Sequence, residues 1–225
     1  MRELSKDKSP HVTDEIFNTA SHLTGAILAV LGTVLLVVEA AAAGKIWHII
    51  SFAIYGLSLL LLFIASSLHH GIDASPRTEE VLRTFDYLAI FPLIAGTYTP
   101  FCLVVLRGTL GWSVFGVVWG VAIVGIVMKA AIRSLPKWVS NTFYLTLGLM
   151  SVVMVVPLFS ALNITAVALL LLGGIFYIAG NVIFTIEKPN PLPGKFGFHE
   201  IWHIFVLAGA FLHYLIMYLY ILPMP

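Results

Sequence analysis

The chain has 225 residues, of which 60% are hydrophobic and only 10% are charged, with a formal net charge of +1. Soluble domains are about half apolar and about a quarter charged, so this composition excludes an ordinary soluble domain, and the lack of basic runs with interleaved aromatics indicates no nucleic-acid partner. The single cysteine, Cys102, excludes an internal disulfide and a cysteine-based zinc site, so any metal ion must be held by nitrogen and oxygen.

The first element is a short polar tail, residues 1–14, which we expect to be cytoplasmic. The apolar stretch that follows it is longer than the roughly 7–15 residues of a signal-peptide core, so no cleaved signal is expected. Residues 15–225 are predicted to form one compact membrane domain. The two longest connectors, 71–83 and 187–199, are too short to hide a soluble domain.

Seven apolar stretches are each long enough to cross the hydrocarbon core, which takes roughly 17–25 residues of helix. We therefore expect an all-α fold, a polytopic membrane protein with seven transmembrane helices. The predicted spans lie near residues 19–40, 46–69, 85–106, 111–131, 140–159, 164–186 and 200–221.

The basic residues are distributed unequally between the two sides of these spans. Ten of the twelve fall on the N-terminal side, and only Lys45 and Arg107 fall on the other. By the positive-inside rule, the N-terminus is predicted to be cytoplasmic and the C-terminus outside. This distribution requires an odd number of spans, which supports seven independently of hydropathy.

The last span opens with the run His199-Glu200-Ile201-Trp202-His203. Histidines four apart lie on one face of a helix, about 6 Å apart along its axis, which suits two ligands of one metal ion. His70 ends the second predicted span and Asp86 begins the third, at the same predicted membrane boundary. Three imidazoles with a carboxylate nearby match a zinc site with three protein nitrogens and one open position for water.

The first helix and the second add polar groups at this boundary. Glu15, Asn18 and His22 are spaced to lie on one face of the first helix, and Ser66 lies one turn before His70. Such groups form the second shell of metal sites, in which an oxygen accepts the other imidazole N–H and a hydroxyl lies near the bound water. The spacing alone does not choose between these roles.

The remaining histidines are interpreted differently. His48 and His11 are expected to be ordinary interfacial or solvated residues. His213 lies ten positions beyond the last candidate ligand, about 15 Å deeper in the helix, and cannot join the same site. His69 points about 100° away from His70, so only one of these two is expected to face the bundle.

The run at 199–203 also matches the zincin pattern, in which two histidines bind zinc and Glu200 is the general base. In a membrane this pattern would indicate an intramembrane metalloprotease, with Asp86 as a third ligand. The pattern is short enough to occur by chance, and His70 already supplies a third imidazole. An acidic residue in the first turn of a helix is also favoured by the helix dipole alone.

Five motifs together resemble the progestin and adiponectin receptor (PAQR) family, above all its bacterial branch, historically called hemolysin III. The resemblance covers nearly the whole chain, and the joint spacing of the motifs is specific. The motifs are Glu15-x-x-Asn18-x-x-x-His22, Ser66-x-x-x-His70, Asp86-Tyr87, the run AGTYTPF at 95–101, and His199-x-x-x-His203.

This resemblance implies a multi-pass protein of the plasma (inner) membrane, with a zinc ion held by His70, His199 and His203. It implies that Asp86 holds the zinc-bound water and that Ser66 lies close to the metal. Because the family's site is similar to that of alkaline ceramidases, the resemblance also implies a hydrolase that acts on lipid amide bonds. The family's bacterial members imply a role in membrane lipid homeostasis. Membrane lipids are then the expected partners, one of them as substrate.

Two functions from different classes remain open. In the first, a zinc-activated water hydrolyses an amide or ester bond of a lipid, with Asp86 accepting or positioning the proton and residues 96–100 lining an internal cavity. In the second, the chain is a sensor or regulator of membrane state with a structural zinc, which direct ligation by Asp86 would favour. A cytolysin or channel is less favoured, because the spans contain no inverted repeat and no ring of charges.

Overall fold

The computed structural model describes residues 6–7, 9–11, 13–132 and 135–225, and these residues are mostly helical. Seven helical segments are long and apolar enough to cross a membrane, with α5 and α6 together forming the fifth, so the predicted all-α fold with seven spans is confirmed. The elements are α1 (Glu15–Ala42), α2 (Ile46–Gly71), α3 (Pro76–Pro100), η1 (Phe101–Val105), α4 (Thr109–Ala131), α5 (Lys137–Leu149), α6 (Val152–Ala161), α7 (Ile164–Ile186), α8 (Phe198–Ile216) and η2 (Met217–Ile221), where η1 and η2 are π-helical turns.

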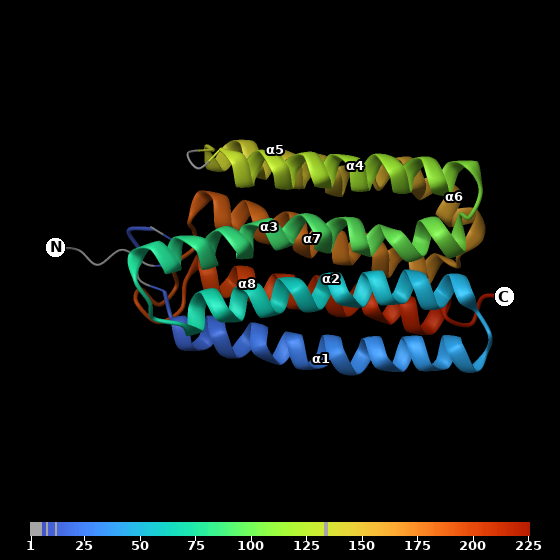
Figure 1. The fold of residues 1–225 in the computed structure, drawn as a ribbon, viewed down its shortest axis with the longest axis horizontal. Coiled ribbons are helices and arrows are strands. Elements are labelled where there is room, and N and C mark those ends of the chain that lie inside the picture. Colours follow the sequence, from blue (N-terminus) through green and yellow to red (C-terminus); the bar gives the residue numbers. More distant parts are fainter. Residues whose placement is uncertain (1–5, 8, 12, 133–134) are drawn as a thin grey trace.

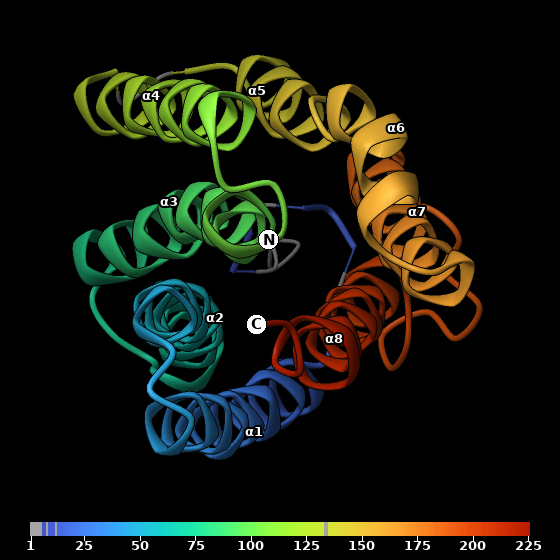
Figure 2. The ribbon, with the colours of Figure 1, turned by 90° about the vertical axis from the view of Figure 1, so that its right-hand side faces the viewer.

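The helices lie side by side along one long axis, and the start of α1 and the C-terminus lie at opposite ends of the bundle (Figure 1). Viewed along that axis, the helices follow one another around the bundle in chain order, with α4 outside α3 (Figure 2). The last helix, α8, closes the ring by packing against α1. Which end faces the cytoplasm stays a prediction from the distribution of Lys and Arg.

The third helix begins at Pro76, nine residues before the predicted start of its span at residue 85. Ser75 caps this helix by accepting a hydrogen bond from the backbone N–H of Thr78, and proline is favoured in the first helical turn. Hydropathy detects only the apolar part of such a helix. Because α3 begins ten residues before Asp86, this residue lies about 15 Å from the start of the helix. The predicted span had placed it in the first turn.

Tyr98 of α3 lies against the break between α5 and α6 in the fifth span. Between α5 and α6 the helix is interrupted at Met150 and Ser151, where the backbone N–H of Ser151 bonds the Gly148 carbonyl at 3.3 Å. The Tyr98 hydroxyl oxygen lies 2.7 and 2.9 Å from the carbonyl oxygens of Leu147 and Gly148, so its one proton is shared between these two acceptors. Inside a membrane every backbone polar group needs a partner from the protein, so this tyrosine makes the break tolerable.

Candidate metal centre

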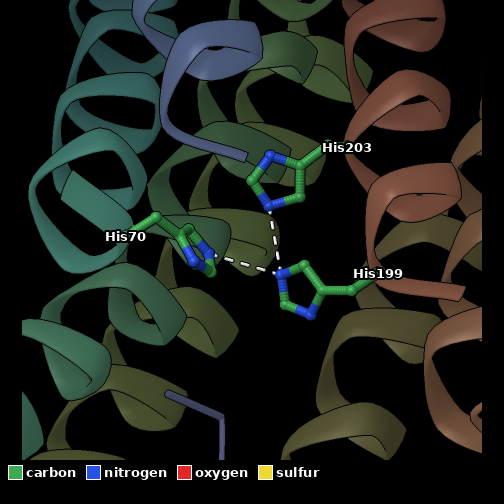
Figure 3. A group of neighbouring side chains, drawn as sticks. All are labelled: His70, His199 and His203. Atoms are coloured by element: carbon green, nitrogen blue, oxygen red, sulfur yellow. Dashed lines mark hydrogen bonds between the residues drawn. The ribbon is translucent and has the colours of Figure 1, made fainter. Parts of the chain in front are cut away.

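Three histidines from α2 and α8 converge at the end of the bundle that holds the N-terminus (Figure 3). His70 is the penultimate residue of α2, whereas His199 and His203 lie one turn apart at the start of α8, and all three are buried. Nε2 of His199 lies 3.3 Å from Nε2 of His70 and 3.1 Å from Nε2 of His203. Nitrogens bound tetrahedrally at 2.0–2.1 Å from zinc are separated by about 3.3 Å. The three Nε2 atoms therefore have the spacing of three ligands of one metal ion.

The other ring nitrogen of each histidine, Nδ1, faces an oxygen atom. The pairs are His70 with Glu15 Oε2 at 2.5 Å, His199 with Asp7 Oδ2 at 3.2 Å, and His203 with Ser21 Oγ at 3.2 Å. Ionised carboxylates only accept hydrogen bonds, and the Ser21 hydroxyl already donates to the Asn18 carbonyl at 3.0 Å. These oxygens favour the proton on Nδ1 of each ring, which leaves the Nε2 lone pairs for a metal ion.

The face of α1 that carries Glu15, Asn18 and His22 forms one wall of this centre. Asn18 and His22 are buried, with 0% and 2% of their surface exposed. The His22 ring stacks on the ring of His203, with the centroids 3.7 Å apart and the planes 24° apart. The helical spacing thus brings Glu15 and His22 to the candidate ligands, and Ser21 joins them from the same helix, whereas the Asn18 amide lies 3.5 Å from Glu200.

Glu200 holds the starts of two helices rather than facing the ligands. It is completely buried, and its Oε2 accepts the backbone N–H of Gly197, the N-cap of α8, at 2.7 Å. Its Oε1 accepts the backbone N–H of Asp14, the N-cap of α1, at 2.6 Å. Both oxygens are engaged in capping, so this carboxylate is not free to take a proton from water. This geometry opposes the metalloprotease interpretation.

Asp86 and Ser66 share a cavity of about 260 Å³ with the ligands His199 and His203. The Ser66 hydroxyl lies beside the Asp86 carboxylate and interacts with it. Among the described residues, the sets of donor atoms close enough to share a metal ion are His70 with His199 and His203, and Asp7 with His69 and His70. Asp86 belongs to neither set, so it faces the ligands across the cavity rather than completing their shell.

The N-terminal tail supplies a carboxylate that sequence reasoning missed. Asp7 is only 3% exposed, and its Oδ1 accepts a hydrogen bond from the Tyr87 hydroxyl at 2.8 Å. The same oxygen lies 3.3 Å from Nε2 of His69, while Oδ2 faces His199. Burial alone raises the pKa of this carboxyl, but the neighbouring histidines outweigh burial and hold the pKa well below its usual range. Asp7 is therefore held as a carboxylate beside the metal ligands.

Lys6 fastens the tail over the end of α2. Its ammonium group donates to the carbonyls of His70 and Ile72, both at 2.9 Å, and pairs with Asp73 at 2.9 Å. Arg83 of α3 in turn donates to the Lys6 carbonyl at 3.3 Å. These bonds satisfy carbonyls at the C-terminal end of α2, where no helical partner remains. The tail is thus part of the wall around the centre.

His69 and His70 are both buried, but by different partners: His70 lies against His199, whereas Asp7 of the tail lies against His69. One expectation about the histidines was wrong. His48 was expected to be interfacial or solvated, but it is 3% exposed. Its Nε2 bonds the Ile221 carbonyl at 3.0 Å, because η2 folds over it at the far end of the bundle.

The family model described as "Haemolysin-III related" matches residues 11–214 of this chain. The chain belongs to the haemolysin III family. Hemolysin-3 of Bacillus cereus is 38% identical to it over 224 residues, 99% of each chain, and a Hemolysin-3 homolog of Bacillus subtilis (strain 168) is 39% identical over 95% of this chain and 97% of its own. Monocyte to macrophage differentiation factor of Homo sapiens is 28% identical over 96% of this chain and 88% of its own length. The predicted family resemblance is confirmed.

In this haemolysin III protein, the change Asp7→Asn is expected to weaken metal binding at the three histidines about 10- to 100-fold, the usual effect of losing an outer-shell partner of a ligand histidine. The amide keeps the shape of the side chain but loses the charge that faces Nδ1 of His199. Competition with a chelating dye in detergent measures this affinity. Asp73→Asn is the matched control, since the Asp73 side chain is 95% exposed and pairs with Lys6 rather than with a histidine of the cluster. Equal affinities for Asp7→Asn and the wild type would contradict the prediction.

Proposed function

We propose that this chain is a zinc-dependent hydrolase of the amide or ester bonds of lipids, acting in membrane lipid homeostasis from the plasma membrane. The observation that carries the proposal is the geometry of His70, His199 and His203. Their Nε2 atoms converge at ligand spacing, their Nδ1 atoms face oxygens, and a cavity opens beside them. The set contains nitrogen donors alone, which suits zinc.

A second cavity, of about 390 Å³, supports a lipid as the substrate. It lies between α3, α5, α6, α7 and α8, and its lining is largely aliphatic and aromatic. Residues such as Leu62, Ile90 and Trp202 line both cavities, so the apolar space continues from the ligands toward the middle of the bundle. An apolar cavity that adjoins a polar reaction site fits a molecule with a reactive head and a hydrocarbon chain.

The residues around the first cavity have distinct tasks in the proposed reaction. Zinc bound by three nitrogens supplies activation of water near neutral pH and polarisation of a carbonyl oxygen. The Asp86 carboxylate takes the proton of the attacking water and passes it to the leaving group. The Ser66 hydroxyl fixes the orientation of that carboxylate. Glu15, Asp7 and Ser21 hold the ligand rings.

The test is release of free fatty acid by the purified protein from two kinds of lipid, a ceramide and a phospholipid. The zinc-loaded protein is compared with protein stripped by a chelator and with stripped protein reloaded with zinc. We expect release that disappears on stripping and returns on reloading. Zinc bound at one ion per chain without release from any lipid would contradict the proposal, and would favour a membrane-state sensor with a structural zinc.

A further inference from the structure

The bundle contains a second polar group far from the metal centre, formed by His213 of α8 and Tyr177 of α7. Their rings are 5.6 Å apart, centroid to centroid. His213 is only 6% exposed, and Nε2 bonds the Leu170 carbonyl at 3.2 Å. Its Nδ1 and the Tyr177 hydroxyl oxygen are both buried, and neither has a hydrogen-bond partner among the described residues.

Two glycines make room for this pair, one on each of the two helices. A Cβ atom on Gly173 of α7 would lie 2.5 Å from Nε2 of His213, and one on Gly209 of α8 would lie 2.8 Å from the ring of Tyr177. Each ring therefore packs against a glycine of the opposite helix. Any larger residue at either position would displace a ring, so the two side chains are held in place by the packing of α7 against α8.

Both residues line the 390 Å³ cavity, and they differ from Thr97 and Tyr98, two other polar side chains in it. The hydroxyl of Thr97 donates to the Leu93 carbonyl, and Tyr98 bonds the carbonyls at the break in the fifth span. An unpaired polar group in a membrane interior costs free energy, and an ionisable residue there indicates a functional site. The unpaired atoms of His213 and Tyr177 thus point to a ligand that supplies their hydrogen bonds.

The position of the pair limits what that ligand is. His213 lies ten residues beyond His203 on one continuous helix, about 15 Å farther along the axis. This distance corresponds to the middle of a hydrocarbon core of about 30 Å, where lipid head groups do not reach. A lipid whose head lies at the metal centre would bring only its chain to this depth.

We propose that His213 and Tyr177 form a subsite for a hydroxyl group carried part-way along the acyl chain of a lipid bound in the apolar cavity. This inference rests on the proposed function in one respect, that the head of the lipid lies at the metal centre. The substrate class is then hydroxylated acyl lipids, in preference to lipids with plain chains.

The hydrogen-bonding capacities of the two residues match one hydroxyl group. The Leu170 carbonyl accepts from Nε2 of His213, so this nitrogen carries the proton and Nδ1 is an acceptor. A chain hydroxyl donates to that Nδ1 and accepts from the phenol of Tyr177. A plain chain leaves both protein groups unpaired, and a site built for a hydroxyl discriminates against the ligand that lacks it.

The test compares ricinoleate with oleate, two fatty acids that differ by one mid-chain hydroxyl group. Each displaces a fluorescent fatty acid from the full-length protein in detergent, a readout that needs no turnover. We expect the wild type to prefer ricinoleate by about three- to tenfold, the range measured for hydrogen bonds inside membrane proteins. Tyr177→Phe and His213→Leu are each expected to reduce this preference to near one.

Tyr218→Phe is the control, because this tyrosine is exposed and is not among the residues that line either cavity. It should keep the preference of the wild type. Equal displacement by the two acids in the wild type, no displacement by either, or a preference that survives Tyr177→Phe would each overturn the subsite. Preference for ricinoleate without release of fatty acid from any lipid would support the subsite while contradicting the hydrolase.

Discussion

His203→Ala is expected to remove almost all bound zinc from the purified protein, from one ion per chain to near none. Zinc sites with four ligands bind with about 10–16 kcal/mol, so one ligand accounts for roughly a quarter of this, about 2.5–4 kcal/mol or roughly 70- to 900-fold in affinity. The loss is not compensated by a neighbouring group. His22, which stacks on the His203 ring, comes from another helix, and it does not belong to either set of donors able to share an ion.

Elemental analysis after gel filtration measures this loss. His199→Ala and His70→Ala should behave in the same way, because all three Nε2 atoms belong to one cluster. His11→Ala is the matched control, since His11 is exposed and lies outside the cluster. Zinc should also raise the melting temperature of the wild type and not that of His203→Ala, because only the folded site binds it. Unchanged zinc content in the three cluster variants would contradict the metal centre.

The spans and one wall of the centre could be predicted from the sequence because local rules determine them. The thickness of the hydrocarbon core sets the length of an apolar helix. This explains why the seven spans predicted from hydropathy agree with the seven in the structure. The helical period places Glu15, Asn18 and His22 on one face, and the structure has them there. The start of α3 was missed because its first turns are polar and are specified by the cap at Ser75 instead.

Contacts between segments far apart in sequence could not be predicted. Asp7 reaches His199 across 192 positions, and nothing in a short polar tail marks it as different from any other surface acid. Glu200 matched a motif for a base, yet its burial against the backbone of Gly197 and Asp14 assigns it to helix capping. Tyr177 gave no signal at all, because an aromatic residue in an apolar span is ordinary until its hydroxyl is found without a partner.

Asp86→Asn is expected to lower the rate of lipid hydrolysis about 10²- to 10⁴-fold, the usual contribution of a positioned general base. The amide has the same shape as the carboxylate and can still bond the Ser66 hydroxyl, but it cannot accept the proton of the attacking water. Zinc content should not change, since Asp86 lies outside the ligand set. The fall should appear in kcat rather than in KM, because the carboxylate acts on the reacting atoms and not on the lipid chain.

The control for this variant is Ser66→Ala, which leaves the carboxylate in place and removes only the hydroxyl that orients it, so its effect should be smaller. Measurement of kcat and zinc content together separates a loss of catalysis from a loss of the metal ion. A variant with full zinc and a lost rate supports the hydrolase. If Asp86→Asn instead loses its zinc, the carboxylate is a fourth ligand, the site is closed to water, and a structural metal in a membrane sensor becomes the better account.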